Sequence, residues 1–185
     1  MTPAPGWTIW FTGLPASGKS TLARALQAAL AARGVQAVVL DSDALRPVLA
    51  PSAGYTPTER DEFYRQLVAL AALLVQQGVN VIIAATANRA AHRAPARRLP
   101  RYLEVWVRRS PQVCQARDPK GLYAGARQGR VQHLPGVDAV YEPPDAPDWV
   151  VDSDHVLPHA AVAALLQRFA WLAEPAPPDA LPSTT

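Results

Sequence analysis

The chain has 185 residues, of which 49% are hydrophobic and 18% are charged, and its formal net charge is +3 at pH 7. This length suits one well-buried domain, expected over residues 1–173, followed by a Pro-rich tail, 174–185, that we expect to be disordered. The sequence has no apolar run of about 18 residues, and residues 1–6 lack the charged-then-apolar pattern of a signal peptide. These features argue against a membrane protein and against a nucleic-acid-binding protein, and they predict a cytoplasmic location.

Strand-like and helix-like segments alternate along the chain. Short apolar runs between turn residues predict strands, and longer amphipathic stretches predict helices. This alternation predicts an α/β fold, a parallel sheet with helices on both faces that binds ligands at the carboxyl ends of its strands. The predicted strands are residues 7–12, 36–40, 79–85, 102–107 and 149–151, and the predicted helices are residues 21–33, 58–77, 89–101, 110–117 and 159–173.

The turn after the first predicted strand has the sequence GLPASGKS, from Gly13 to Ser20. It matches the GxxxxGK[ST] phosphate-binding loop, whose glycines let backbone N–H groups point at phosphate oxygens. Lys19 would hold the phosphates of ATP, and the Ser20 hydroxyl would bind Mg²⁺. The sequence therefore predicts a three-layer P-loop domain of the nucleotide-kinase type. Its predicted ATP-binding residues here are Gly13, Ala16, Ser17, Gly18, Lys19, Ser20 and Thr21.

Two carboxylates, Asp41 and Asp43, follow the second predicted strand. A spacing of two places both on one side of an extended chain. Beside a triphosphate, one carboxylate suits binding of Mg²⁺ waters and the other suits accepting a proton from an attacking hydroxyl. The alternative is a helix cap, because Asp-Ser-Asp is common where helices begin. The third predicted strand ends without an acidic residue and the chain has no NKxD guanine-binding sequence, which favours a small-molecule kinase over a motor ATPase or a GTPase.

Residues 118–144 fit neither a strand nor a helix. A loop this long in a small domain is usually functional, and this one contains Lys120, one of only two lysines in the chain beside Lys19. Lysine is a compact charge on a flexible stem, whereas arginine is a planar fork, so a site that follows a moving phosphoryl group favours lysine. We therefore predict that residues 118–144 form a lid over the phosphates.

Two further features have structural interpretations. Cys114 is the single cysteine, which excludes an internal disulfide, and its helical surroundings predict a half-buried structural thiol. The basic run 89–101 predicts a solvated helix face or the lining of an anionic-substrate site, because it lacks the interleaved aromatic residues of a nucleic-acid surface.

These motifs resemble the adenylylsulfate kinase family, which phosphorylates the 3′-hydroxyl of adenosine 5′-phosphosulfate with MgATP. The resemblance covers residues 8–153 and rests on the phosphate loop and on the sequences LDSDALR, GYTPTER, RDPKGLY and GVDAVYEPP. It implies that Asp43 is the base, that Asp41 supports the metal, and that Lys19 and Lys120 assist the transfer. It also implies an ATP adenine beside Arg117 and an acceptor site formed by Asp43, Arg46, Tyr55, Arg60, Lys120, Leu122 and Leu134.

The chain departs from the family pattern on the acceptor side. Phe63 stands where the family has a substrate-binding Asn, Leu134 where it has a second aromatic residue, and residues 85–88 read Ala-Thr-Ala-Asn in place of Phe-Ile-Ser-Pro. We therefore expect weaker binding of adenylylsulfate, which the combined Leu134→Phe and Phe63→Asn substitutions should improve.

The sequence thus predicts an ATP-dependent adenylylsulfate kinase that acts on a small molecule, without nucleic-acid or membrane partners, and that assembles as a homodimer. One alternative is a kinase for a hydroxyl of another nucleotide conjugate or of a sugar. A second is a nucleotide-binding protein without turnover, against which the intact set of Lys19, Ser20, Asp43 and Lys120 argues.

Overall fold

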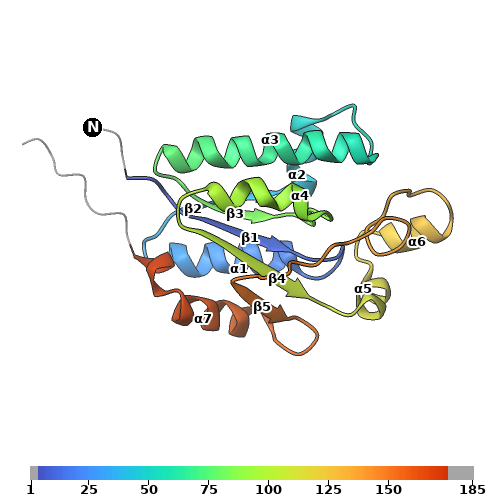
Figure 1. The fold of residues 1–185 in the computed structure, drawn as a ribbon. Helices are drawn as coiled ribbons and strands as arrows, with labels where there is room; N and C mark the ends of the chain where they lie inside the picture. The colour runs from blue at the N-terminus through green and yellow to red at the C-terminus, as the bar shows by residue number, and fades with distance from the viewer. Residues whose placement is uncertain (1–3, 175–185) are drawn as a thin grey trace, which may run out of the picture.

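A five-stranded parallel sheet forms the centre of the computed structural model, which describes residues 4–174 (Figure 1). The predicted disordered tail lies outside the described residues except for Glu174. The strands follow the order β2-β3-β1-β4-β5, and every neighbouring pair is parallel. The predicted α/β class is confirmed, and the strands lie within two residues of their predicted bounds: β1 (Thr8–Thr12), β2 (Ala37–Asp41), β3 (Asn80–Ala84), β4 (Tyr102–Arg108) and β5 (Trp149–Asp152).

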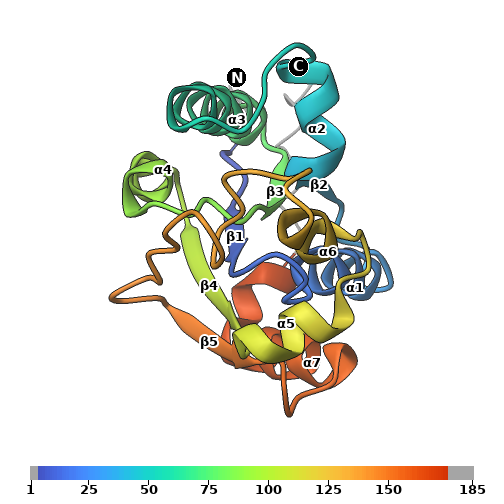
Figure 2. The same cartoon turned by 90° about the vertical axis from the view of Figure 1, so that its right-hand side faces the viewer.

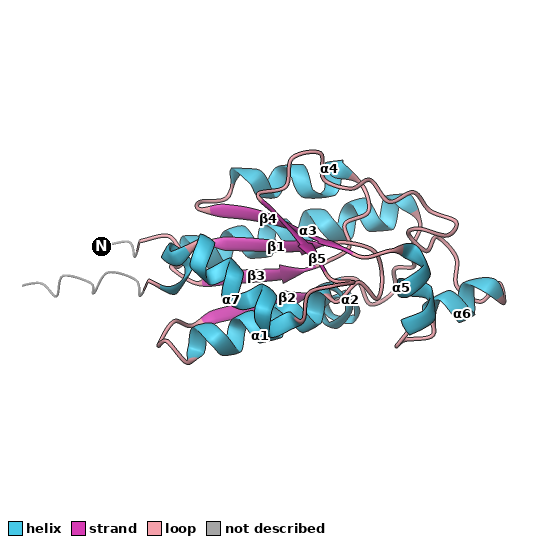
Figure 3. Cartoon of the chain, turned by 90° about the horizontal axis from the view of Figure 1, so that it is seen from below, coloured by secondary structure: helices cyan, strands magenta, loops and turns pink. Residues whose placement is uncertain are grey.

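Helices cover both faces of the sheet, which makes the three predicted layers. One face carries α1 (Lys19–Ala31) and α7 (Pro158–Arg168), as the view from below shows (Figure 3). The other face carries α2 (Ser42–Leu49), α3 (Pro57–Gln76) and α4 (Ala90–Arg93). Two short helices, α5 (Pro111–Arg117) and α6 (Leu122–Arg127), lie beyond the carboxyl ends of the strands (Figures 1 and 2). Within residues 4–174, none of the helices is both long and apolar enough to span a membrane.

The side chains of β1 alternate between two separate cores. Ile9 and Phe11 pack with α1 and α7, whereas Trp10 packs with α3 on the opposite face. All five residues of β1 are buried, because the strand has a neighbouring strand on each side and a helical layer on each face. The central strand therefore fixes the start of the phosphate loop at the middle of the carboxyl edge.

Four helical predictions need correction. Residues 42–49 form α2, which the sequence analysis did not predict, and the lid contains α6 although it was expected to hold no helix. The basic run forms only the one-turn α4 and a 3₁₀ helix, Ala94–Arg98, since Pro95 lacks the N–H that a continuing α-helix needs. The last helix ends at Arg168, and a 3₁₀ helix, Ala170–Ala173, follows it.

Most of the basic run is a solvated surface, as predicted, because Arg89, Arg97, Arg98 and Arg101 are exposed, but His92 and Arg93 are buried. Arg93 is 2% exposed. Its Nε donates to Glu104 Oε1 at 2.9 Å, and its two Nη atoms donate to the carbonyl oxygens of Ala87, at 2.5 Å, and Glu142, at 2.9 Å. This one side chain therefore joins β4, the segment after β3 and the far end of the lid.

The near end of the lid packs against the phosphate loop. The Tyr123 hydroxyl donates to the Pro15 carbonyl oxygen at 3.1 Å. Cys114, Tyr123 and Leu134 form a small buried core together with Leu14 of the loop. Cys114 is fully buried, not half-buried as predicted, and this burial raises the pKa of its thiol to about 11, as suits a structural residue.

Candidate active site

The phosphate loop folds around its own lysine. Gly13 has φ 154°, and a Cβ there would lie 2.4 Å from the Val107 carbonyl oxygen, so the position requires glycine. Lys19 Nζ donates to the carbonyl oxygens of Gly13, at 3.0 Å, and Leu14, at 2.8 Å. An ammonium group has three donors, so these contacts leave one N–H for a ligand.

Lys19 is nearly buried, at 9% exposed. Burial lowers the pKa of its ammonium to about 8, and the negative charge of Asp43 partly opposes this effect. An anion bound in the loop would favour the charged ammonium and so recover the free energy lost on desolvation. The loop is therefore electrostatically suited to phosphate.

A cleft of about 520 Å³ opens beside the loop, between α2, the start of α3, the end of α5 and the lid. In the end-on view the lid crosses the carboxyl ends of the strands (Figure 2). The predicted site residues Gly13, Ser17 and Asp41 do not line the cleft. Those that do are Ala16, Gly18, Lys19, Ser20, Thr21, Asp43, Arg46, Tyr55, Arg60, Arg117, Lys120, Leu122 and Leu134.

Two arginines on the side of α2 and α3 are buried without a carboxylate partner. Arg46 and Arg60 are 8% and 7% exposed, and neither forms an ion pair within residues 4–174. The Arg46 guanidinium lies 4.5 Å from the centre of the Tyr55 ring and donates to the Gly54 carbonyl oxygen at 3.2 Å.

Arg60 is held in a similar way. Its Nε donates to the Tyr55 carbonyl oxygen at 3.0 Å, and its Nη2 donates to the His133 carbonyl oxygen of the lid at 2.6 Å. Burial lowers the pKa of the Arg60 guanidinium. Buried charges without partners are strongly unfavourable, so Arg46 and Arg60 indicate a site for an anionic group.

Asp41 and Asp43 have different surroundings. The chain turns into α2 directly after Asp41, so the strand spacing from which we placed both carboxylates on one side does not apply. Asp41 Oδ1 accepts a hydrogen bond from Asp43 N at 3.0 Å and caps α2, as the alternative interpretation proposed. Asp43 lies in the cleft and forms an ion pair with Lys120 of the lid. Lys120 of the lid and Asp43 of α2, both singled out from the sequence, therefore meet.

The donor set fits a magnesium ion that arrives with a nucleotide. Among residues 4–174, no three His, Cys, Asp or Glu side chains gather into a metal-binding group. The Ser20 hydroxyl, however, lines the cleft beside Lys19. Magnesium commonly takes one or two protein oxygens and completes its shell with water and phosphate.

Phe63 does not contact the cleft. It is fully buried, its ring centre lies 4.1 Å beneath the Arg46 guanidinium, and it packs edge-on against Tyr64 at 5.3 Å. The position that we took as a lost substrate contact is thus the support of a cleft arginine. Phe63→Asn should therefore not restore a substrate contact in this chain.

Several cleft residues were missed by the sequence analysis, among them Tyr64, Thr86, Asp118, Arg130 and Gln132. Tyr64 follows Arg60 by four residues, so helical spacing places both on one face of α3 and could have indicated it. Arg130 and Gln132 lie in the predicted lid, but only the folded loop shows which of its side chains reach the cleft.

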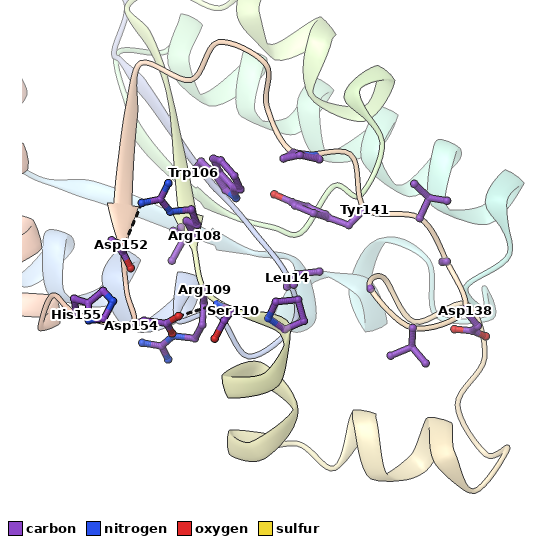
Figure 4. Close-up of a pocket in the computed structure, with 17 residues that line it drawn as sticks. Leu14, Trp106, Arg108, Arg109, Ser110, Asp138, Tyr141, Asp152, Asp154 and His155 are labelled. Atoms are coloured by element: carbon purple, nitrogen blue, oxygen red, sulfur yellow. Dashed lines mark hydrogen bonds and ion pairs between the residues drawn. The ribbon is translucent and has the colours of Figure 1, made fainter.

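A second cavity, of about 850 Å³, lies between the ends of β4 and β5 and the returning lid segment (Figure 4). Trp106 and Tyr141 form one wall, and the ion pairs Arg108–Asp152 and Arg109–Asp154 form another. It contains none of the predicted site residues. This second cavity is larger than the first cleft, but the residues predicted to bind phosphate line the first cleft.

The sequence profile described as adenylylsulphate kinase matches residues 5–152, most of the chain. The chain belongs to the adenylylsulfate kinase family. It is 44% identical to the adenylyl-sulfate kinase of Paraburkholderia xenovorans over 90% of this chain and 94% of that protein. It is 43% identical to the adenylyl-sulfate kinase of Myxococcus xanthus, over 83% and 85% of the two chains.

A solved structure of the same family has a similar fold. The APS kinase of Mycobacterium tuberculosis, in complex with AMPPNP and APS, superposes with a TM-score of 0.85 and 36% identity, covering 91% of this chain and 99% of that one. The fold and the phosphate loop predicted from the sequence are therefore those of the adenylylsulfate kinase family. The protein is an enzyme of this family.

The lowered pKa of Lys19 predicts a pH dependence of nucleotide binding. In the free protein the ammonium loses its proton above pH 8, whereas bound phosphate favours the charged form, so binding takes up a proton there. The dissociation constant of ATP should rise roughly tenfold between pH 7 and pH 9. Calorimetry in buffers of different ionisation enthalpy would measure both the constant and the proton uptake. Lys19→Met should lose this dependence, and a wild-type constant unchanged over this range would contradict the assignment.

The buried position of Phe63 predicts that Phe63→Asn is destabilising. The substitution removes a ring beneath Arg46 and buries an amide, so the free energy of unfolding should fall by about 3 kcal/mol or more. Urea unfolding would measure it, with Val48→Asn at a 73% exposed position of α2 as the control. A stable Phe63→Asn protein with improved acceptor binding would show that the side chain reaches the substrate after all.

Proposed function

We propose that this protein transfers the γ-phosphoryl group of ATP to the 3′-hydroxyl of adenylylsulfate. The observation that carries the proposal is the pair Arg46 and Arg60, two buried and unpaired cations in the same cleft as Lys19 and Asp43. The cleft thus has one place for a triphosphate and a second for an anionic acceptor. A sugar without a charged group would leave both arginines uncompensated.

The residues divide the transfer between them. Lys19 and the loop amides hold the β- and γ-phosphates, and Ser20 would hold a magnesium ion that neutralises developing charge on them. Asp43 accepts the proton of the acceptor 3′-hydroxyl while that oxygen forms its bond to the γ-phosphorus and the bond to the β-phosphate oxygen breaks. ADP leaves, and the phosphorylated acceptor carries the new phosphate ester.

Lys120 links this chemistry to the lid. In the structure it pairs with Asp43, the proposed base. When the acceptor hydroxyl bonds to Asp43, the Lys120 ammonium becomes available to the transferring phosphoryl group. Both side chains are more than half exposed, at 52% and 59%, so this exchange of partners involves little desolvation.

The remaining predicted contacts define the two ends of the cleft. Tyr55 is 48% exposed and would stack on the acceptor adenine, and Leu134, although it is only 4% exposed, lines the same cleft. Leu122 lines the same cleft from the lid, and Arg117 would lie beside the ATP adenine. We retain Asp41 as a magnesium-water ligand, a cytoplasmic location and a homodimer as proposals.

The activity is tested by ADP release, measured with a coupled assay over a panel of acceptors. Adenylylsulfate should be phosphorylated, and neutral sugars should not. Lys19→Ala should abolish turnover because no other side chain of the loop offers an ammonium. If only another nucleotide conjugate is phosphorylated, adenylylsulfate is not the acceptor. If the protein binds ATP but phosphorylates none of the acceptors, it is a non-catalytic nucleotide-binding protein.

The roles of the two aspartates are separable by amide substitution. Asp43→Asn should lower kcat by roughly two to four orders of magnitude with little change in ATP affinity, the scale of general-base loss. Asp41→Asn keeps the helix cap and removes the charge, so it should raise only the magnesium concentration required for half-maximal rate. Titrating ATP and Mg²⁺ against both variants would measure this. Equal, small effects would leave the pair as a helix cap and nothing more.

A further inference from the structure

Tyr64 is a buried residue of the cleft that the proposed mechanism does not use. It is 3% exposed and lines the cleft from α3, four residues after Arg60. Its ring lies 5.3 Å from the ring of Phe63 on one side and 4.5 Å from the ring of His92 on another. The phenol is thus fixed by packing at the floor of the cleft.

The hydroxyl of Tyr64 has one hydrogen bond and an unused donor. Its oxygen accepts from the N–H of Ala87 at 2.9 Å. A phenol carries one hydrogen of its own to donate, and within residues 4–174 no oxygen accepts it. The charged neighbour, Arg60, has only donors, so it cannot accept that hydrogen either.

The charges that act on the phenol are those of the acceptor site. Burial raises the pKa of Tyr64, the positive charges of Arg60 and Arg46 oppose the rise, and the negative charge of Asp43 adds to it. The neutral hydroxyl is therefore the form present at neutral pH. It lies among the two unpaired cations and the proposed base.

We propose that Tyr64 is a further acceptor-binding residue, whose hydroxyl donates a hydrogen bond to the anionic group of the acceptor beside Arg60. This inference rests on the proposed function, since it names a contact within the same acceptor site. Arg46 and Arg60 would supply the charge, and Tyr64 would supply a neutral donor of fixed direction. A charge-assisted hydrogen bond of this kind adds both affinity and geometric selection.

A buried hydroxyl of fixed position discriminates among ligands, because a buried donor without a hydrogen-bond acceptor is unfavourable. An acceptor that places no oxygen beside Tyr64 would leave the O–H without a partner, in a site where water has little access. The contact would therefore favour nucleotides with an anionic 5′ group over nucleosides.

The test compares Tyr64→Phe with Tyr102→Phe. Each substitution removes one buried phenol oxygen, and Tyr102 packs against the same apolar core as Tyr64 but lies outside the cleft. Calorimetry with adenylylsulfate, and competition by adenosine, would be measured for both variants and the wild type, along with KM for ATP and the melting temperature.

Tyr64→Phe should weaken adenylylsulfate binding about tenfold and leave adenosine binding and the KM for ATP unchanged. Tyr102→Phe should change none of the three. If Tyr64→Phe binds adenylylsulfate as the wild type does, or loses adenosine by the same factor, the hydroxyl does not contact the anionic group and only this inference fails. If the wild type neither binds nor phosphorylates adenylylsulfate, the proposed function fails with it.

Discussion

Three cations are buried around one cleft, and the elements that surround them must balance their charge. Lys19, Arg46 and Arg60 each lie at or below 9% exposed, and a folded chain keeps such charges together only if other groups replace the lost hydration. Here carbonyl oxygens and aromatic faces do so, from the phosphate loop, from the segment before α3 and from the lid. Within residues 4–174 no carboxylate oxygen lies within 4 Å of a nitrogen of either arginine, which leaves both guanidinium groups available to a ligand.

The lid completes this arrangement because it contacts every part of the cleft. Tyr123 bonds to the phosphate loop, Lys120 pairs with Asp43 on α2, and the His133 carbonyl oxygen receives Arg60 from α3. Its far end is fixed by Arg93, a buried side chain that also pairs with Glu104 in β4. Arg60 and Lys120, two side chains proposed to bind the acceptor and the phosphoryl group, thus also contact or belong to this segment, and Arg93 fixes its returning end.

The sheet and the phosphate loop were predictable from the sequence, because apolar runs and the GxxxxGK[ST] spacing depend on neighbouring residues alone. Helix α2 was not predicted, since the metal and base roles of Asp41 and Asp43 were favoured over the helix cap, and only the chain direction after β2 shows the cap. Arg93 was assigned to solvent with its basic neighbours, although a partner eleven residues away in β4 buries it. The four-residue spacing from Arg60 could have indicated Tyr64, but its hydrogen bond to the Ala87 N–H depends on which face of α3 meets the segment after β3. In each case the missing information was a tertiary contact.

The departures from the family pattern also have a tertiary explanation. Phe63, Tyr64, Ala85 and Ala87 all belong to one buried cluster, and the Ala87 N–H is bonded to the Tyr64 hydroxyl. Small residues after β3 thus face large aromatic residues on α3, so the volume lost on one side is occupied from the other. Positions 63, 85 and 87 therefore belong to one packed unit, and a substitution at one of them alone would leave a void or a clash. The same cluster places the Phe63 ring beneath Arg46 and the Tyr64 phenol near Arg60, so these departures from the family pattern lie directly under the two arginines of the cleft.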